Sequence, residues 1–116
     1  MIVVVFEFVP DPERGARYFE LAAALRRHVE SIDGFLGVER YRGLSDPERY
    51  VSVSFWRDRE ALERWRAHPA HRAAQREGIE KGLFRDFRIS TAEILGQRTL
   101  GDVLARFREE ATPRQG

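Results

Sequence analysis

The chain has 116 residues, 42% of them hydrophobic and 34% charged, with a net charge of +1 and no cysteine. This length suits one domain, the near-neutral charge gives no basic field for a nucleic-acid partner, and the lack of cysteine excludes disulfides and thiolate metal sites. No apolar run approaches the roughly 20 residues of a membrane span, and Glu7 and Pro10 interrupt the first run too early for a signal peptide, so we expect a cytoplasmic protein with no membrane partner.

The beginning of the chain predicts a strand followed by a helix. Residues 2–9 are rich in β-branched and aromatic types, and both faces of the resulting strand are mainly apolar, so both should be covered. Asp11 is suited to cap a helix that starts in the next residues. Apolar residues then recur at helical spacing as far as Ile32, and Gly34 is a plausible stop.

The next two segments predict a β-hairpin. Residues 35–42 and 50–56 alternate as strands, and the loop between them is short and rich in turn residues. The second strand has two different faces, with Val51, Val53 and Phe55 on one and Ser52 and Ser54 on the other.

A helix, a break, a second helical stretch and a strand follow. Asp58 is expected to cap the helix, and Pro69 should interrupt it because proline removes a helical donor and clashes with the preceding turn. A further helical stretch runs from about residue 70 to 81 and ends at Gly82, and residues 84–94 alternate as the last strand.

The predicted order over residues 1–95 is β-α-β-β-α-β, the ferredoxin-like pattern of an α+β sandwich. Residues 96–116 form a separate C-terminal helix and tail. Thr99 and Asp102 resemble a capping arrangement before an amphipathic helix, and we expect the ending 111–116 to be disordered.

The predicted sheet has an uncovered face. A ferredoxin-like domain places its helices on one face of the sheet, while the first strand is apolar on both. A second copy of the chain, packing sheet on sheet, is the simplest cover. We therefore expect a homodimer, in which the C-terminal helix lies on its own subunit or reaches across the interface.

Four stretches of the chain resemble the antibiotic biosynthesis monooxygenase (ABM) family of dimeric α+β barrels. They are residues 32–37, 53–56, 60–62 and 65–71, which read IDGFLG, VSFW, EAL and WRAHPAH. The resemblance covers roughly residues 1–95 and leaves the C-terminal segment outside it. A fold does not fix a reaction, so the resemblance is more specific for the architecture than for the activity.

The resemblance implies a homodimer with a substrate pocket between the sheet and the helices of each subunit. It also implies a monooxygenase that oxidises an aromatic or quinol-like small molecule with O2 and without a bound cofactor. In such an enzyme the substrate is deprotonated and its electron-rich anion reduces O2 in a dry pocket. The catalytic candidates are His71 as proton acceptor, Trp65, and Arg88 as oxyanion stabiliser if its strand face points into the pocket. The candidates for substrate binding are Phe6, Tyr18, Trp56 and His68.

A haem-binding or haem-degrading enzyme is the first alternative that the resemblance offers. That branch of the family combines an asparagine on the first strand with a tryptophan and a haem-ligating histidine on the second helix. Trp65 matches the tryptophan, and His71 is a candidate ligand that follows it more closely than that branch would expect. The chain has no asparagine, and Phe6 or Glu7 stands near its place. A dimer that binds a small ligand without catalysis, or serves a stress or regulatory role, is a further alternative.

The candidate residues also have purely structural interpretations. Trp65 lies on an inner helix stripe and is suited to core packing, and His71 is suited to be an ordinary helix-end histidine. Arg88 is at least as well suited to pair with Asp86 or Glu39 across strands.

The remaining polar residues favour structure over chemistry. His68 precedes Pro69 and is suited to cap the broken helix or to face solvent. Because Pro69 separates His68 from His71 and no carboxylate motif completes a site, we expect no metal. The helix arginines alternate with glutamates and indicate solvated faces; they are Arg26, Arg27, Arg57, Arg59, Arg64, Arg66, Arg72 and Arg76.

Overall fold

The computed structural model describes residues 1–111 and confirms the ferredoxin-like α+β fold. The elements in chain order are β1 (Ile2–Pro10), α1 (Ala16–Glu30), β2 (Phe35–Arg42), β3 (Tyr50–Trp56), α2 (Arg59–Ala67), α3 (Pro69–Glu80), β4 (Phe84–Glu93) and α4 (Leu100–Ala111). The strands form one antiparallel sheet in the order β2-β3-β1-β4, which includes the predicted hairpin of β2 and β3. The predicted disorder of the ending concerns residues that lie, except for Ala111, outside the described part of the chain.

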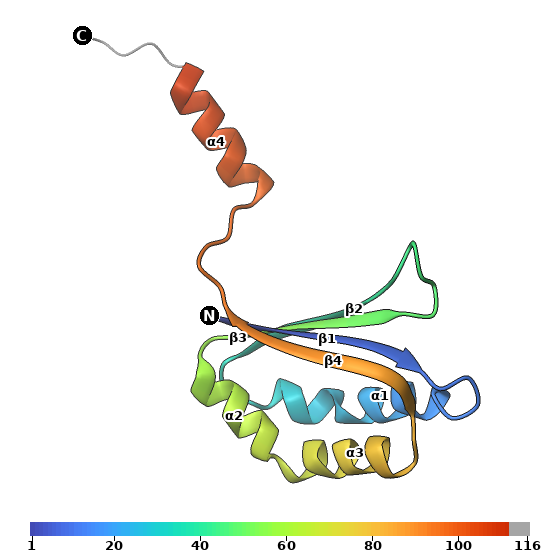
Figure 1. Ribbon diagram of the computed structural model, residues 1–116. Helices are drawn as coiled ribbons and strands as arrows, with labels where there is room; N and C mark the ends of the chain where they lie inside the picture. The colour runs from blue at the N-terminus through green and yellow to red at the C-terminus, as the bar shows by residue number, and fades with distance from the viewer. Residues whose placement is uncertain (112–116) are drawn as a thin grey trace.

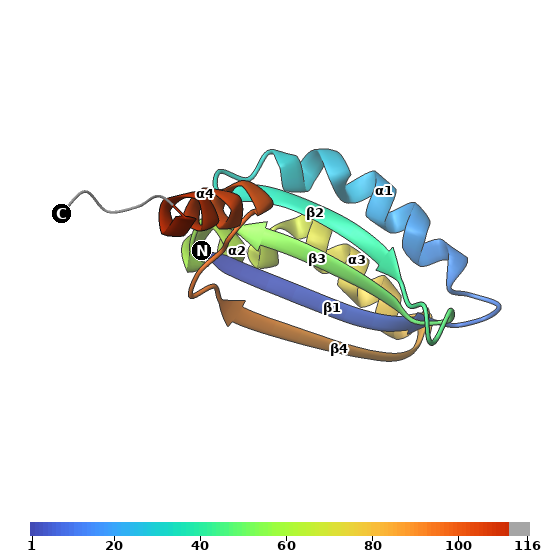
Figure 2. The ribbon, with the colours of Figure 1, turned by 90° about the horizontal axis from the view of Figure 1, so that it is seen from above.

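The sheet has one covered and one open face. Helices α1, α2 and α3 all lie on the same side of it, whereas α4 stands away beyond the end of β4 (Figure 1). Seen from above, the four strands lie side by side with the three helices behind them (Figure 2). The even-numbered residues of β1 face the helices, and two of them, Ile2 and Phe8, are buried. Its odd-numbered residues therefore point to the open face.

The first helix begins later than the sequence predicts. The Oδ1 atom of Asp11 accepts hydrogen bonds from the backbone N–H groups of Glu13 (2.9 Å) and Arg14 (3.0 Å). These bonds close a turn over residues 12–15, and the helix starts only at Ala16. Asp11 thus caps a turn that precedes the helix.

Pro69 divides the second helical region into α2 and α3, as the sequence predicts. Asp58 caps α2 by accepting a hydrogen bond from the N–H of Ala61 at 2.9 Å. His68 then leaves helical geometry, with φ −64° and ψ 130°, because the ring of Pro69 disfavours a helical residue before it. The Nδ1 atom of His68 accepts a hydrogen bond from the N–H of Ala70 at 3.1 Å and so caps α3.

The hydrophobic core has two parts. One part joins β1, α1, β3 and α2, and its buried residues are Ile2, Val29, Trp56, Ala61, Leu62 and Trp65. The other is an aromatic cluster around the fully buried Phe8. Its rings lie with centroids 4.5 to 6.2 Å from that of Phe8 and belong to Phe6, Tyr18, Phe19, Tyr50 and Phe84.

Helix α4 carries the predicted capping arrangement and an exposed apolar stripe. The N–H of Thr99 donates to Asp102 Oδ2 at 2.9 Å, and the N–H of Asp102 donates to Thr99 Oγ1 at 3.2 Å. Leu100, Leu104 and Phe107 remain 75%, 42% and 63% exposed. None of the helices within residues 1–111 combines the length and apolar character that a membrane span needs. The expected cytoplasmic location stays a prediction.

Gly34 should be a position where an added methyl group destabilises the fold. Its φ is +93°, and a Cβ atom there would lie 2.7 Å from the Cβ of Ala61 at the start of α2. We expect Gly34→Ala to lower the free energy of unfolding by about 2 kcal/mol, as measured by urea denaturation.

Gly96→Ala is the matched control, because a Cβ atom at Gly96 would meet nothing within 4 Å. Its effect should stay within about 0.5 kcal/mol. Equal losses in the two variants would contradict the role assigned to Gly34.

Candidate active-site pocket

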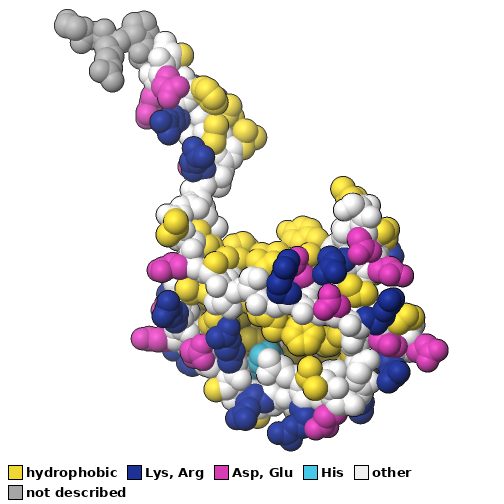
Figure 3. All heavy atoms as spheres, viewed as in Figure 1, with side chains coloured by type: hydrophobic (Ala, Val, Ile, Leu, Met, Phe, Trp, Pro, Cys, Tyr) yellow, Lys and Arg dark blue, Asp and Glu magenta, His cyan; other side chains and the backbone are white. Residues whose placement is uncertain are grey.

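A pocket of about 800 Å³ lies between the sheet and the helices α1, α2 and α3, between the two parts of the core. Figure 3 shows apolar side chains gathered in the hollow between the sheet and the helices. This volume is within the range of small-molecule sites. The lining is mainly apolar and aromatic, and it comes from all four strands and all three helices.

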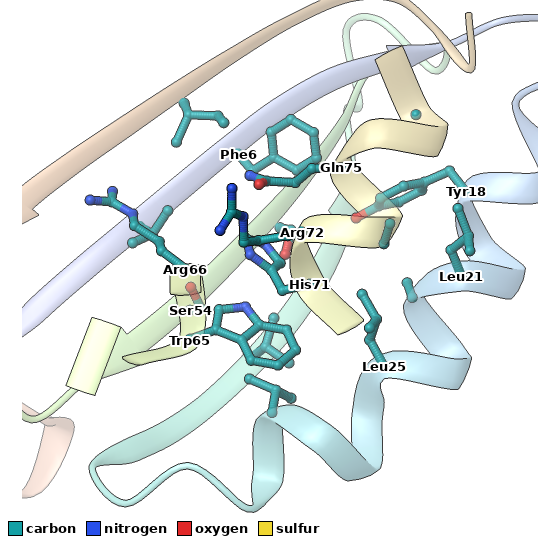
Figure 4. A pocket seen from close by; sticks show the side chains of 18 of the residues that line it. Phe6, Tyr18, Leu21, Leu25, Ser54, Trp65, Arg66, His71, Arg72 and Gln75 are labelled. Atoms are coloured by element: carbon teal, nitrogen blue, oxygen red, sulfur yellow. The ribbon is translucent and has the colours of Figure 1, made fainter. Parts of the chain in front are cut away.

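Trp65 and His71 form the most distinctive contact in this pocket. Their ring centroids are 4.8 Å apart and the planes are inclined by 36° (Figure 4). On one continuous helix, two residues with this spacing would lie about 9 Å apart along the axis and about 120° apart around it, out of reach of each other. The break at Pro69 changes the direction of the chain and brings the two rings together.

The surroundings of the His71 ring disfavour its charged form. Burial is the largest cause and lowers its pKa below the ordinary value of 6.5. The positive charges of Arg66 and His68 act in the same direction, and the backbone of Arg66 opposes them only in part. The Nδ1 atom of His71 is buried without a hydrogen-bond partner in residues 1–111. A neutral imidazole in an apolar pocket is able to accept a proton from a ligand.

Aromatic rings and two serines form the walls next to His71. Phe6 and Tyr18 both line the pocket, and their rings meet edge to face at 6.1 Å. Strand β3 presents Ser52 and Ser54 to the pocket, so its valine face is the one that points away from the helices. Trp56 is buried at the base, where its Nε1–H donates to the Oγ of Ser54 at 3.0 Å. Phe6, Tyr18, Trp56 and Trp65 are thus brought together with His71, as predicted, while their roles in binding stay predictions.

Arg88 does not reach this pocket. Its neighbours Phe87 and Ile89 line the pocket, so Arg88 points to the opposite face of the sheet. There its Nε donates to Glu7 Oε2 at 2.7 Å, directly across from it on β1. Arg88 was expected to stabilise an oxyanion only if its strand face pointed into the pocket. That face points away, so the structure does not support this role for Arg88. Its hydrogen bond instead lowers the pKa of Glu7.

His68 is also placed outside the pocket lining, although its ring lies near that of Trp65, with centroids 5.6 Å apart. Its Nδ1 atom is occupied by the N–H of Ala70, which is the capping role that the residue before a proline can play. A direct contact with substrate is therefore not supported for His68.

Four of the arginines that the sequence pattern assigns to solvated helix faces are exposed, as predicted, and also line the pocket; they are Arg26, Arg66, Arg72 and Arg76. Arg66 is held by Glu63 Oε1 at 2.8 Å and by Thr91 Oγ1 at 3.0 Å. Alternation with glutamates gave no signal for this placement, because it does not show which side of a helix borders the pocket. The sequence also did not show that Ser52 and Ser54 face the helices, because both faces of the neighbouring strand β1 are apolar.

The pocket offers no metal centre within residues 1–111, where no group of three or more His, Cys, Asp or Glu side chains could hold an ion. Strand β1 presents Val4 and Phe6 to the pocket, so no amide group reaches it from that strand. The site of the asparagine that the haem-degrading branch would use is thus filled by apolar side chains.

Comparisons with known proteins agree with the fold and the resemblance. The chain is 37% identical over 94 residues to a jasmonate monooxygenase from Pyricularia oryzae. The match covers 81% of this chain and 43% of that relative, so the chain spans less than half of the relative's length.

Two solved structures share the fold at low sequence identity. Rv0793 from Mycobacterium tuberculosis has a TM-score of 0.73 and 20% identity, with 84% of this chain and 98% of that chain covered. SnoaB, a cofactor-independent oxygenase from Streptomyces nogalater, has a TM-score of 0.69 and 18% identity, with 85% and 95% covered. The family model of the antibiotic biosynthesis monooxygenases matches residues 1–77. On this match, the chain belongs to the antibiotic biosynthesis monooxygenase family.

Proposed function

We propose that this chain is a monooxygenase that oxidises an aromatic or quinol-like small molecule with O2 and without a bound cofactor. The observation that carries the proposal is a neutral histidine against a tryptophan ring inside an apolar pocket of about 800 Å³. The names of two similar proteins, a jasmonate monooxygenase and a cofactor-independent oxygenase, support oxygenase chemistry.

In the proposed mechanism, His71 accepts the proton of a phenolic hydroxyl. The flat substrate lies between the rings of Trp65 on one side and Phe6 and Tyr18 on the other, all of which line the pocket. Deprotonation makes the ring electron-rich, and the apolar surroundings leave its anion poorly solvated. Both effects favour electron transfer from the substrate to O2.

The reaction needs no external reductant. At an activated CH2 group next to the phenolate, a C–O bond forms with one oxygen atom of O2. The O–O bond then breaks, the second oxygen atom leaves as water with the two hydrogens of that carbon, and a carbonyl remains. All of the electrons come from the substrate, and the proton taken by His71 returns to the product.

We also propose that the chain works as a homodimer whose subunits meet at the open face of the sheet. This face carries Val3 and Val5 of β1 and Val51, Val53 and Phe55 of β3, all only half-buried in one copy. Such an apolar sheet face favours packing against an equivalent face. The Glu7–Arg88 ion pair lies on the same face.

His71→Gln should lower the rate of O2 uptake with dihydroxyanthrones, which carry the activated CH2 group, by about 100-fold, because it removes the general base. An oxygen electrode, with a metal chelator present, measures this rate.

His28→Gln is the matched control, because His28 lies on α1 outside the pocket lining. Its rate should equal that of the wild type. If wild type consumes no O2 with these substrates, or if both variants lose activity equally, the proposed function is wrong. A Soret band on haem titration that His71→Gln abolishes would point to the haem alternative.

The stability of the folded chain should depend on pH through His71. The pKa of His71 is below 6.5 in the folded chain, so the unfolded chain takes up a proton first as the pH falls below that value. Stability therefore decreases with falling pH between 6.5 and the lower folded pKa. We expect the melting temperature of wild type to fall more than that of His71→Gln between about pH 7.5 and about pH 5.5. Equal falls in the two proteins would show that His71 is not buried neutral.

The proposed homodimer can be tested at the open face of the sheet. Light scattering should find a dimer at micromolar concentration, and Val53→Lys should shift it to monomer by placing a charge on the open face. Ala24→Lys, on an exposed position of α1, should leave the dimer intact. A monomeric wild type would overturn the proposed assembly.

A further inference from the structure

Arginine dominates the charge around the pocket. Five arginines line it against a single acidic residue, Glu80; they are Arg26, Arg40, Arg66, Arg72 and Arg76. Two of the five are held by neighbouring carboxylates. Arg26 pairs with Glu30 at 2.8 Å and Arg66 with Glu63 at 2.8 Å. The pocket therefore combines an apolar interior with more positive charge than its own carboxylates neutralise.

Arg72 differs from the paired arginines in position and in partners. It is the fourth residue of α3, directly after His71, and it is an exposed residue that lines the pocket beside the His71 ring (Figure 4). Its guanidinium makes no ion pair or side-chain hydrogen bond within residues 1–111. Arg40, by comparison, lies over the ring of Tyr18, with Cζ 5.8 Å from the centroid.

We infer that Arg72 binds a carboxylate group of the substrate, so that this pocket prefers an apolar aromatic acid to the corresponding neutral phenol. The inference rests on the proposed function because it concerns the same pocket. A guanidinium presents two parallel N–H donors that match the two oxygens of a carboxylate, and the apolar lining suits a flat hydrocarbon body.

The placement of Arg72 also sets the orientation of such a ligand. Consecutive residues of a helix point about 100° apart, so His71 and Arg72 contact different parts of one molecule. With the carboxylate at Arg72, the ring lies against Trp65 and its hydroxyl group faces His71. Arg72 is thus a specificity-determining residue, and His71 remains the proton acceptor.

A matched pair of ligands tests this inference without turnover. We would titrate the full-length protein with 6-hydroxy-2-naphthoate and with its methyl ester by calorimetry, at low salt and under nitrogen. The two compounds share ring and hydroxyl group and differ in the charge. Wild type should bind the acid about tenfold more tightly than the ester. Arg72→Gln should bind both alike, while Arg27→Gln, which changes the same charge outside the pocket lining, should keep the preference.

The possible outcomes separate the inference from the proposed function. Equal binding of acid and ester by wild type, a preference that survives in Arg72→Gln, or no binding of either compound would overturn the inference. Arg72→Lys keeps a charge without the fork, so its preference should be intermediate, and it serves as a second variant if Arg72→Gln fails to fold by circular dichroism. If the preference holds but no substrate consumes O2, the carboxylate site stands and the oxygenase proposal fails.

Discussion

The junction of His68 and Pro69 turns one amphipathic segment into two helices, and the pocket depends on the change of direction that it introduces. Pro69 supplies no N–H and forces the preceding residue out of the helix, while the imidazole of His68 satisfies one of the N–H groups that the new helix exposes. The capped break is a local structure that does not depend on the ligand. It allows α2 to pack its tryptophan into the core while α3 turns a histidine toward the same space.

The pocket interrupts what would otherwise be one continuous core. On one side of it the indole of Trp56 and the side chains around it are buried, and on the other the rings around Phe8 pack in stacked, tilted and edge-to-face arrangements. The pocket of about 800 Å³ is the space between these two parts. The side chains that line the pocket lack packing contacts across it, which makes the folded chain less stable. A bound apolar molecule should supply such contacts and stabilise the folded chain.

Much of the architecture could be predicted from sequence because it depends on local signals. Alternation defined the strands, Asp58 and Pro69 defined the limits of α2, and Thr99 with Asp102 defined the start of α4. The direction of single side chains was harder to predict. Arg88 was a candidate for the pocket, yet its strand register pairs it with Glu7 on the other face. Arg72 was assigned to a solvated helix face and is exposed there, but the sequence did not show that it also borders the pocket. The error at Arg88 concerns which face of the sheet meets the helices, and β1 gives no clue because both of its faces are apolar.

Strand β3 reverses the usual distribution of its side chains, with serines toward the helices and valines away from them. The hydroxymethyl groups of Ser52 and Ser54 are small, so these two positions of β3 leave room for a ligand over the centre of the sheet. A larger residue at Ser52 would fill the space without disturbing the backbone pairing, whereas Ser54 also holds the indole of Trp56 in the core. The size of the molecule that this frame accepts can therefore change through the one position at Ser52, while the rest of the fold stays the same.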